Sequence, residues 1–208
     1  MPYHFNDSVL IIFCKAPVPG QVKTRLTPAL SEQQACDLHI ELSRRILGVA
    51  TQRRLCPVQL WCSPTIKHDF FSNAAANYGV SLHLQHGADL GARMHQAFCS
   101  ALSQYKHALL IGCDCPSLTA ADLEHGFTVL QQNADLVLSP AEDGGYVLIG
   151  LNQAQPTLFS DINWGGTEVF AQTLSRSRLL QLRYHELTTQ WDVDTISDLA
   201  RYRRLLAQ

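Results

Sequence analysis

The sequence lacks an excess of charge of either sign. Its 208 residues include 16 Lys and Arg against 18 Asp and Glu, which gives a formal net charge of −2. Nucleic acids and anionic membranes are bound through strongly basic surfaces, so this balance argues against both as the main partner. A slightly acidic protein can still form a small cationic pocket, and a phosphorylated small molecule therefore stays a candidate ligand.

Long apolar runs are also absent. The apolar run 9–14 is far shorter than the roughly 20 residues that cross a bilayer, and residues 1–8 lack the positive charges of a secretion signal. We expect no membrane span and a cytoplasmic location.

The cysteines and histidines lack the spacing of a zinc site. None of the seven cysteines forms a C-x-x-C pair, and Cys113 and Cys115 have no second pair that would complete a tetrahedral site. The histidines are scattered, and His83 and His86 do not have the i, i+4 spacing of helical zinc ligands. We expect reduced cysteines that pack as small apolar side chains.

What the chain does contain is an alternation of short β-rich runs and helical patterns. Strands are predicted at 9–14, 58–62, 81–84, 108–112, 135–139, 146–151 and about 180–187. Helices are predicted after Ser31, Thr119 and Thr195, which have the residue pattern of N-caps, and at 68–78, 90–105 and 167–177. This order predicts one α/β domain over residues 1–208, with a Rossmann-like, mainly parallel sheet flanked by helices. In such sheets ligands bind beyond the carboxyl ends of the strands.

The loop after the first predicted strand is cationic. Lys15, Lys23 and Arg25 lie close to two prolines and Gly20, and the three cations could converge on phosphate oxygens. The loop lacks the G-x-G-x-x-G pattern of dinucleotide-binding folds, and Val22 stands where a Walker A loop has Gly. From the charges alone, phosphate binding and a solvated basic loop are about equally supported.

Two later segments place carboxylates where a metal would be useful. Asp114 follows the predicted strand 108–112, and Asp192 and Asp194 precede the helix that starts after Thr195. A hard divalent cation takes one or two protein carboxylates and completes its shell with water and phosphate. The alternatives are that Asp114 caps a turn and that Asp194 stabilises a helix N-terminus.

In order along the chain, these segments resemble the bacterial nucleotide-diphospho-sugar transferase-like proteins, which are glycosyltransferases of the GT-A fold. That group is distantly related to the phospholactate and molybdenum-cofactor guanylyltransferases. The resemblance covers nearly the whole chain and rests on K…G…KTRL (15–26), DLG-x-RM (89–94), G-x-DCP (112–116), DGGYVLIGL (143–151), Trp164 and DVDT…DL (192–199). Two positions depart from the pattern: Cys113 stands where Ser or Thr is expected, and Gly166 replaces a threonine after Trp164.

The resemblance implies roles for individual residues. Asp114 and Asp194 would hold Mg²⁺ or Mn²⁺, and Asp114, Asp143 and Lys23 would be catalytic. The nucleotide and its phosphates would be contacted by Lys15, Gly20, Lys23, Thr24, Arg25, Gln85, Gly91 and Arg93. The sugar or acceptor would be contacted by Asp143, Gly144, Gly145, Tyr146 and Trp164. The segment Asp143–Gly145 could instead be only a hairpin turn.

These observations favour a metal-dependent transferase that uses a nucleotide donor, with glycosyl transfer from a nucleotide-diphosphate sugar to a small-molecule acceptor as the first interpretation. The alternatives are a nucleotidyltransferase that joins a nucleoside triphosphate to a phosphorylated molecule, and a nucleotide-binding module without catalysis. The base, sugar, acceptor and stereochemical outcome stay open, as does assembly into a homodimer.

Overall fold

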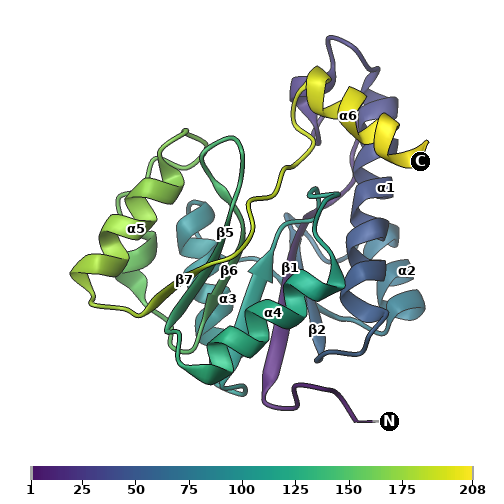
Figure 1. Cartoon of the computed structure of the whole chain (residues 1–208). Coiled ribbons are helices and arrows are strands. Elements are labelled where there is room, and N and C mark those ends of the chain that lie inside the picture. Colours follow the sequence, from purple (N-terminus) through teal and green to yellow (C-terminus); the bar gives the residue numbers. More distant parts are fainter. Residues whose placement is uncertain (1, 208) are drawn as a thin grey trace.

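A seven-stranded sheet forms the centre of the protein in the computed structural model, which describes residues 2–207 (Figure 1). The strand order is β3-β2-β1-β4-β6-β5-β7. All neighbouring strands are parallel except β6, which is antiparallel to both β4 and β5. The strands are β1 (Ser8–Lys15), β2 (Val58–Ser63), β3 (Ser81–Leu84), β4 (His107–Ile111), β5 (Leu136–Pro140), β6 (Tyr146–Leu151) and β7 (Tyr184–Glu186). The predicted α/β class with a mainly parallel sheet is confirmed.

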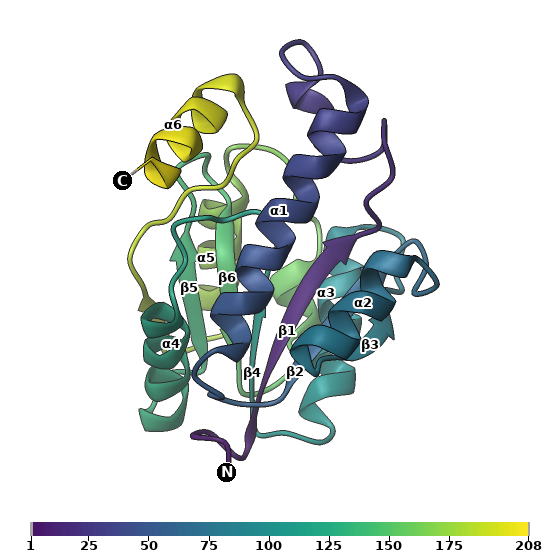
Figure 2. The same ribbon diagram turned by 90° about the vertical axis from the view of Figure 1, so that its right-hand side faces the viewer.

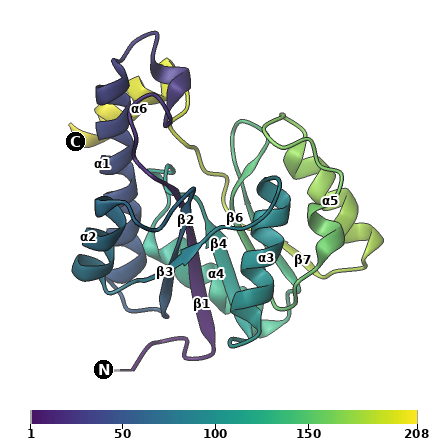
Figure 3. The same cartoon turned by 180° about the vertical axis from the view of Figure 1, so that it is seen from behind.

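Helices cover both faces of this sheet. They are α1 (Glu32–Thr51), α2 (Asp69–Tyr78), α3 (Leu90–Leu102), α4 (Ala120–Gln132), α5 (Val169–Leu179) and α6 (Ile196–Leu206), with short 3-10 helices η1 (Thr24–Leu26) and η2 (Pro156–Phe159). One face packs against α1, α2 and α4 (Figure 2), and the other packs against α3, α5 and η2 (Figure 3). The result is a three-layer arrangement.

The alternation of side chains along β1 explains why both faces must be covered. Leu10 and Ile12 point to the α1 side, whereas Val9, Ile11 and Phe13 point to the α3 side, because successive residues of a strand face opposite ways. Apart from Lys15, every residue of β1 is buried. A strand that is apolar on both sides is stable only between two layers.

The three predicted N-caps are confirmed. Ser31, Thr119 and Thr195 each accept a hydrogen bond from the backbone N–H three residues later, and the side chain of that later residue bonds back to the cap. Each capping box satisfies amide groups that the first turn of a helix leaves without partners.

The last strand is shorter than predicted. The pattern at 180–187 suggested a strand throughout, but only Tyr184–Glu186 pairs with β5. Helix α5 extends to Leu179, Leu180 caps it, and Gln181 adopts a left-handed conformation with φ 53°. The chain needs these residues to reverse direction before it can join the sheet.

Helix α6 lies beyond the sheet, beside the N-terminal half of α1 (Figures 1 and 2). The two helices share a small apolar cluster that includes Leu38 and Leu42 of α1 and Leu199 and Tyr202 of α6. The Tyr202 hydroxyl donates a hydrogen bond of 2.6 Å to Glu41. Among the described residues, no helix is both long and apolar enough to cross a membrane.

The topology gathers several loops at one edge of the sheet. β1 and β4 are parallel, so the segments that follow them emerge together. The hairpin between β5 and β6 reaches the same edge because β5 runs with β4, opposite to β6. The segment after β7 then crosses this edge to reach α6 (Figure 1). Polar residues from four distant parts of the sequence therefore meet there.

Candidate functional site

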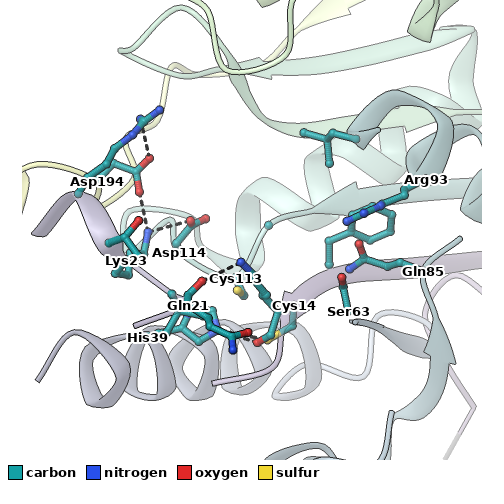
Figure 4. A pocket seen from close by; sticks show the side chains of 17 residues that line it. Cys14, Gln21, Lys23, His39, Ser63, Gln85, Arg93, Cys113, Asp114 and Asp194 are labelled. Atoms are coloured by element: carbon teal, nitrogen blue, oxygen red, sulfur yellow. Dashed lines mark hydrogen bonds and ion pairs between the residues drawn. The ribbon is translucent and has the colours of Figure 1, made fainter. Parts of the chain in front are cut away.

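A cavity of about 470 Å³ opens at this edge, beyond the carboxyl ends of β1 and β4 (Figure 4). Its wall combines the cationic loop after β1, residues of α1 and α3, and the segment that starts at Gly112. The predicted site residues in this wall are Lys15, Lys23, Thr24, Arg25, Gln85, Arg93, Asp114 and Asp194. Gly20 and Gly91 are not part of it.

Lys23 is the most constrained residue of the cavity. Its backbone is left-handed (φ 48°), and its Nζ lies 2.9 Å from Asp114 Oδ2 and 2.8 Å from Asp194 Oδ1. The Lys23 side chain is only 5% exposed. Burial by itself would lower the pKa of Lys23, but the carboxylates of Asp114 and Asp194 outweigh burial and raise the pKa above its usual value. Lys23 is therefore a fixed positive charge between the two predicted metal ligands.

Three carboxylates form an acidic cluster around this lysine. Oxygen atoms of Asp114, Asp192 and Asp194 lie within 4.8 Å of one another. Burial and the neighbouring carboxylates of Asp114 and Asp194 raise the pKa of Asp192 to about 7. In contrast, Lys23 holds the pKa of Asp114 below its usual value although burial acts in the opposite direction. The cluster thus contains more negative charge than Lys23 alone can balance.

Asp192 was not predicted as a metal ligand, although the sequence contained a signal for it. Asp192 and Asp194 are two residues apart in an extended segment, and alternate residues of such a segment face the same side. Val193, between them, is fully buried, and its N–H donates to the Asp114 carbonyl at 3.2 Å. This backbone bond joins the segment before α6 to the segment after β4.

The other two cations of the loop, Lys15 and Arg25, differ in how available their side chains are to a ligand. Lys15 Nζ donates to the carbonyl of Gln21 at 2.7 Å, which closes the loop on itself. Arg25 is 68% exposed and reaches Asp194 with one nitrogen at 3.5 Å. Most of the guanidinium of Arg25 is therefore available to a ligand. Gly20, with φ 75°, allows the turn between these cations.

The opposite wall is built by residues predicted to contact the nucleotide. The Gln85 amide nitrogen donates to the Trp61 carbonyl at 2.8 Å, and Arg93 Nε donates to the Gly87 carbonyl at 3.2 Å. Both side chains are thereby oriented along the cavity (Figure 4). Gly91 instead serves packing, because a Cβ there would lie 2.7 Å from the Trp164 ring.

A smaller pocket of about 200 Å³ adjoins the cavity and shares Phe13, Leu90 and Gly112 with it. The predicted acceptor residues Asp143, Gly145, Tyr146 and Trp164 line this pocket. Its wall is otherwise mainly apolar. Asp143 accepts a hydrogen bond of 2.9 Å from the Gly145 N–H, which fixes the turn between β5 and β6.

Gly144 does not line the smaller pocket but is required for its shape. Its φ is 91°, and a Cβ there would collide with the Thr167 carbonyl oxygen. The Gly144 carbonyl accepts a hydrogen bond of 2.9 Å from the Phe170 N–H at the start of α5. The turn is thus a hairpin and also a docking point for α5.

Sequence reasoning did not single out His39, which lies on the floor of the cavity with Cys14 and Cys113. His39 is 4% exposed, and its Nε2 lies 2.9 Å from the Lys15 carbonyl. A polar residue on the apolar side of α1 was the only sequence signal for it. Because the carbonyl can only accept, His39 donates this bond and anchors the start of the cationic loop.

Comparison with proteins of known structure identifies relatives of this arrangement. A protein from Desulfovibrio desulfuricans G20, provisionally named a nucleotide-diphospho-sugar transferase, is 30% identical, with a TM-score of 0.87 over 97% of this chain and 88% of its own. A search of curated proteins gave no match.

More distant structures share the fold. CMP:2-keto-3-deoxy-manno-octonic acid synthetase in complex with CTP is 13% identical, with a TM-score of 0.59 over 98% of this chain and 99% of its own. The 4-diphosphocytidyl-2C-methyl-D-erythritol synthase of Anaerococcus prevotii DSM 20548 is 9% identical, with a TM-score of 0.61 over the same shares. The predicted GT-A type fold is therefore confirmed.

A sequence family described as "Uncharacterized protein conserved in bacteria (DUF2064)" matches residues 46–166. That segment is more than half of the chain and runs from α1 to the pocket residue Trp164. Together with the 30% identity over nearly the whole chain, this match shows that the protein belongs to the DUF2064 family.

Proposed function

We propose that the protein is a metal-dependent transferase that moves a glycosyl group from a nucleotide-diphosphate sugar to a small acceptor. The observation that carries this proposal is the meeting of three carboxylates and a cationic loop beside two adjoining pockets. The larger pocket has the volume of a small-molecule site and suits the nucleotide, and the smaller one suits the sugar and acceptor.

The acidic cluster fits a divalent cation. Asp114, Asp192 and Asp194 offer hard oxygen ligands within 4.8 Å of one another, and Mg²⁺ and Mn²⁺ prefer such ligands. Burial, together with the neighbouring carboxylates of Asp114 and Asp194, raises the pKa of Asp192 to about 7, and a cation at the cluster would favour its ionised form. A bound cation would supply charge neutralisation for the diphosphate that leaves the sugar.

The protein's own cations complete this environment. Arg25 is exposed at the rim and can hold two phosphate oxygens with its planar guanidinium. Lys23 balances and positions Asp114 and Asp194. In this conformation Lys23 is too buried to reach a phosphate, so a direct role toward the donor requires its release from the carboxylates.

Asp143 is the candidate for positioning the acceptor hydroxyl and accepting its proton. It lies in the smaller pocket, with one carboxylate oxygen held by the Gly145 N–H. Trp164 and Tyr146 form apolar walls that would exclude water from the reacting bond.

A thermal-shift panel of nucleotides and nucleotide sugars, with Mg²⁺ or Mn²⁺ or with chelator, tests the proposal. A bound ligand at 100 times its Kd raises the free energy of unfolding by about 2.7 kcal/mol.

Asp114→Ala should lose the metal-dependent part of the thermal shift and keep its fold. Arg25→Ala should weaken donor binding by about tenfold or more, and Arg25→Lys should restore only part of this loss. Unchanged metal dependence in Asp114→Ala would contradict the metal assignment.

Nucleotidyl transfer is the second candidate, since the fold is shared with a synthetase whose structure contains CTP. The products separate the two reactions. Glycosyl transfer releases a nucleoside diphosphate, whereas nucleotidyl transfer from a triphosphate releases pyrophosphate, and ³¹P NMR distinguishes them. A donor soluble in the cytoplasm is common to both, and we place the protein there.

A further inference from the structure

A second cleft, of about 490 Å³, lies between α1, α6 and the loop that leads into α4. Three arginines line it: Arg45 from α1, and Arg201 and Arg204 from α6. Among the described residues, no carboxylate lines this cleft. None of its lining residues belongs to the wall of the cavity of about 470 Å³ that we assign to the nucleotide donor, called the donor cavity below. The tertiary structure thus assembles a second cationic site from residues more than 150 positions apart in the sequence.

Two of these arginines are held in place by the protein. Arg45 Nε donates to the Pro116 carbonyl at 3.1 Å. The Arg201 guanidinium lies over the Trp191 ring, 4.2 Å from its centre, and forms an ion pair with Glu142 at 2.8 Å, so the charge of Arg201 is partly balanced. Each contact uses part of a guanidinium and leaves other N–H groups free, because an arginine has five donors. A ligand would therefore bind arginine side chains that are already ordered in the folded protein, so binding would cost less conformational entropy.

Arg204 supplies charge that nothing in the described structure balances. No ion pair or hydrogen bond joins its side chain to another described residue. Its neighbour Arg203 lines a different cleft, together with Asp37 and Glu41 of α1. Adjacent positions on α6 thus differ in surroundings, with acidic groups near Arg203 and cationic ones near Arg204.

Besides the arginines, the cleft is lined by two hydroxyl residues and three apolar or aromatic ones: Ser117, Thr119, Pro116, Trp191 and Leu205. Trp191 is only 8% exposed, and Pro116 and Leu205 form the rest of the apolar part of the wall. Planar guanidinium groups match phosphate oxygens, and an aromatic wall matches a ring or other apolar part of the same molecule. We propose that this cleft binds a phosphate ester, a small molecule with one phosphorylated end and one apolar or ring-shaped end.

The cleft is separate from the donor cavity but shares its structural segments. Ser117, in the cleft wall, hydrogen-bonds with the backbone of Trp191. The same two segments continue to Asp114 and to Asp192 and Asp194. A ligand in the cleft would therefore hold together the two segments that carry the acidic cluster.

Isothermal titration with phenyl phosphate in metal-free buffer at about 0.15 M salt tests the proposal. Arg204→Ala should weaken binding by about tenfold, and Arg204→Lys should recover part of the loss because the charge is kept. Arg203→Ala is the matched control from the same turn of α6 and should bind within twofold of wild type. Arg25→Ala, in the donor cavity, should also leave this binding unchanged.

Several outcomes would overturn the assignment. Absence of binding, or equal affinity of wild type and Arg204→Ala, removes the site. Loss of binding in Arg25→Ala would place the phosphate in the donor cavity instead. Equal weakening by Arg203→Ala and Arg204→Ala would show that phenyl phosphate is attracted to the overall positive charge of α6 and not to a specific site in the cleft. Since Arg204 is exposed, circular dichroism should confirm that its variants keep the fold.

Discussion

At the scale of single residues, Lys23 determines the charge balance of the candidate site. It is buried against two carboxylates, and a third carboxylate, Asp192, has no ion pair with any described residue. The loop that follows β1 thus serves two purposes. Lys23 completes the acidic cluster, while Arg25 remains exposed to solvent and to a ligand.

Lys23→Met should destabilise the metal-free protein, because the variant leaves Asp114 and Asp194 close together without their cation. Breaking a fully buried pair costs about 3–5 kcal/mol, and the partly exposed carboxylates reduce our expectation to about 1–3 kcal/mol. Mg²⁺ or Mn²⁺ should restore part of the loss. Urea denaturation with and without chelator measures both effects.

Lys15→Met is the control for this variant, since among the described residues the Lys15 side chain bonds a single group, the exposed backbone carbonyl of Gln21. We expect it to change the free energy of unfolding by less than about 1 kcal/mol, with no dependence on metal. Equal stability of Lys23→Met and wild type would mean that the two ion pairs contribute nothing to the fold.

Asp192→Asn should stabilise the metal-free protein at pH 8. The pKa of Asp192 is raised to about 7 from a usual value of 3.8, so the folded state resists losing this proton. The contribution of Asp192 therefore lowers the free energy of unfolding of wild type progressively as the pH rises from about 4 to 7. Above pH 7 this loss of stability stays at its full size. The variant avoids it, and we expect a gain of about 1–3 kcal/mol at pH 8.

The pH dependence provides the internal control for Asp192→Asn. At a pH well below the usual value of 3.8, about pH 3, the Asp192 carboxyl group is mostly protonated in both the folded and the unfolded chain, so the gain should shrink toward zero as the pH falls. Denaturation curves at pH 5 and pH 8 measure the trend. A gain that is the same at both values would point to a change in packing rather than to charge.

At the scale of elements, the start of α3 is fitted closely against η2 and the segment that carries Trp164. Gly91 is the contact point, where the Phe159 carbonyl and the Trp164 ring would lie 2.6 Å and 2.7 Å from an added Cβ. Trp164 lines the smaller pocket and Leu90 lines both pockets. The shape of the proposed acceptor pocket therefore depends on the absence of one side chain.

Gly91→Ala should lower the free energy of unfolding by about 1–3 kcal/mol through this overlap. Gly48→Ala is the matched control, because Gly48 also lies in a helix but has nothing within 4 Å of the position of a Cβ. Gly48→Ala should raise stability by about 0.5–1 kcal/mol through helix propensity. Thermal unfolding of both variants compares them, and equal effects would contradict the packing argument.

At the scale of the whole molecule, α6 stands apart from the two large apolar clusters that flank the sheet. Its own cluster with α1 is much smaller, and the segment before it bonds to the Asp114 carbonyl. Elements with few buried apolar contacts open more readily than a central sheet. The acidic cluster therefore joins a rigid strand end, at Asp114, to a more loosely held segment, at Asp192 and Asp194.

Hydrogen exchange should show this difference. In the free protein, amides of α6 should exchange at least tenfold faster than those of β1 and β4, since their opening costs less free energy. Metal with a bound donor should slow exchange in α6 and at the Val193 amide. Exchange in α2, which does not line the cavity, is the control and should not change. Equal protection of α6 and β1 without ligand would contradict the prediction.

The local features of the sequence determined much of this protein. The apolar pattern of β1 required two covering layers, and Ser31, Thr119 and Thr195 fixed helix starts, because caps and side-chain alternation act over a few residues. The rule that ligands bind beyond strand ends also selected Asp114 and the loop from Lys15 to Arg25. These effects are local or follow from the order of elements, so they can be read along the chain.

The tertiary structure decided which of these groups face one another. It placed Lys23 between carboxylates 91 and 171 positions away, which no local pattern encodes. It also set Asp192 into the acidic cluster, buried His39 under the cationic loop, and brought Arg45 to Arg204. Each of these contacts depends on how α1 and α6 pack at the edge of the sheet, and packing across long sequence separations determines burial, charge balance and pKa.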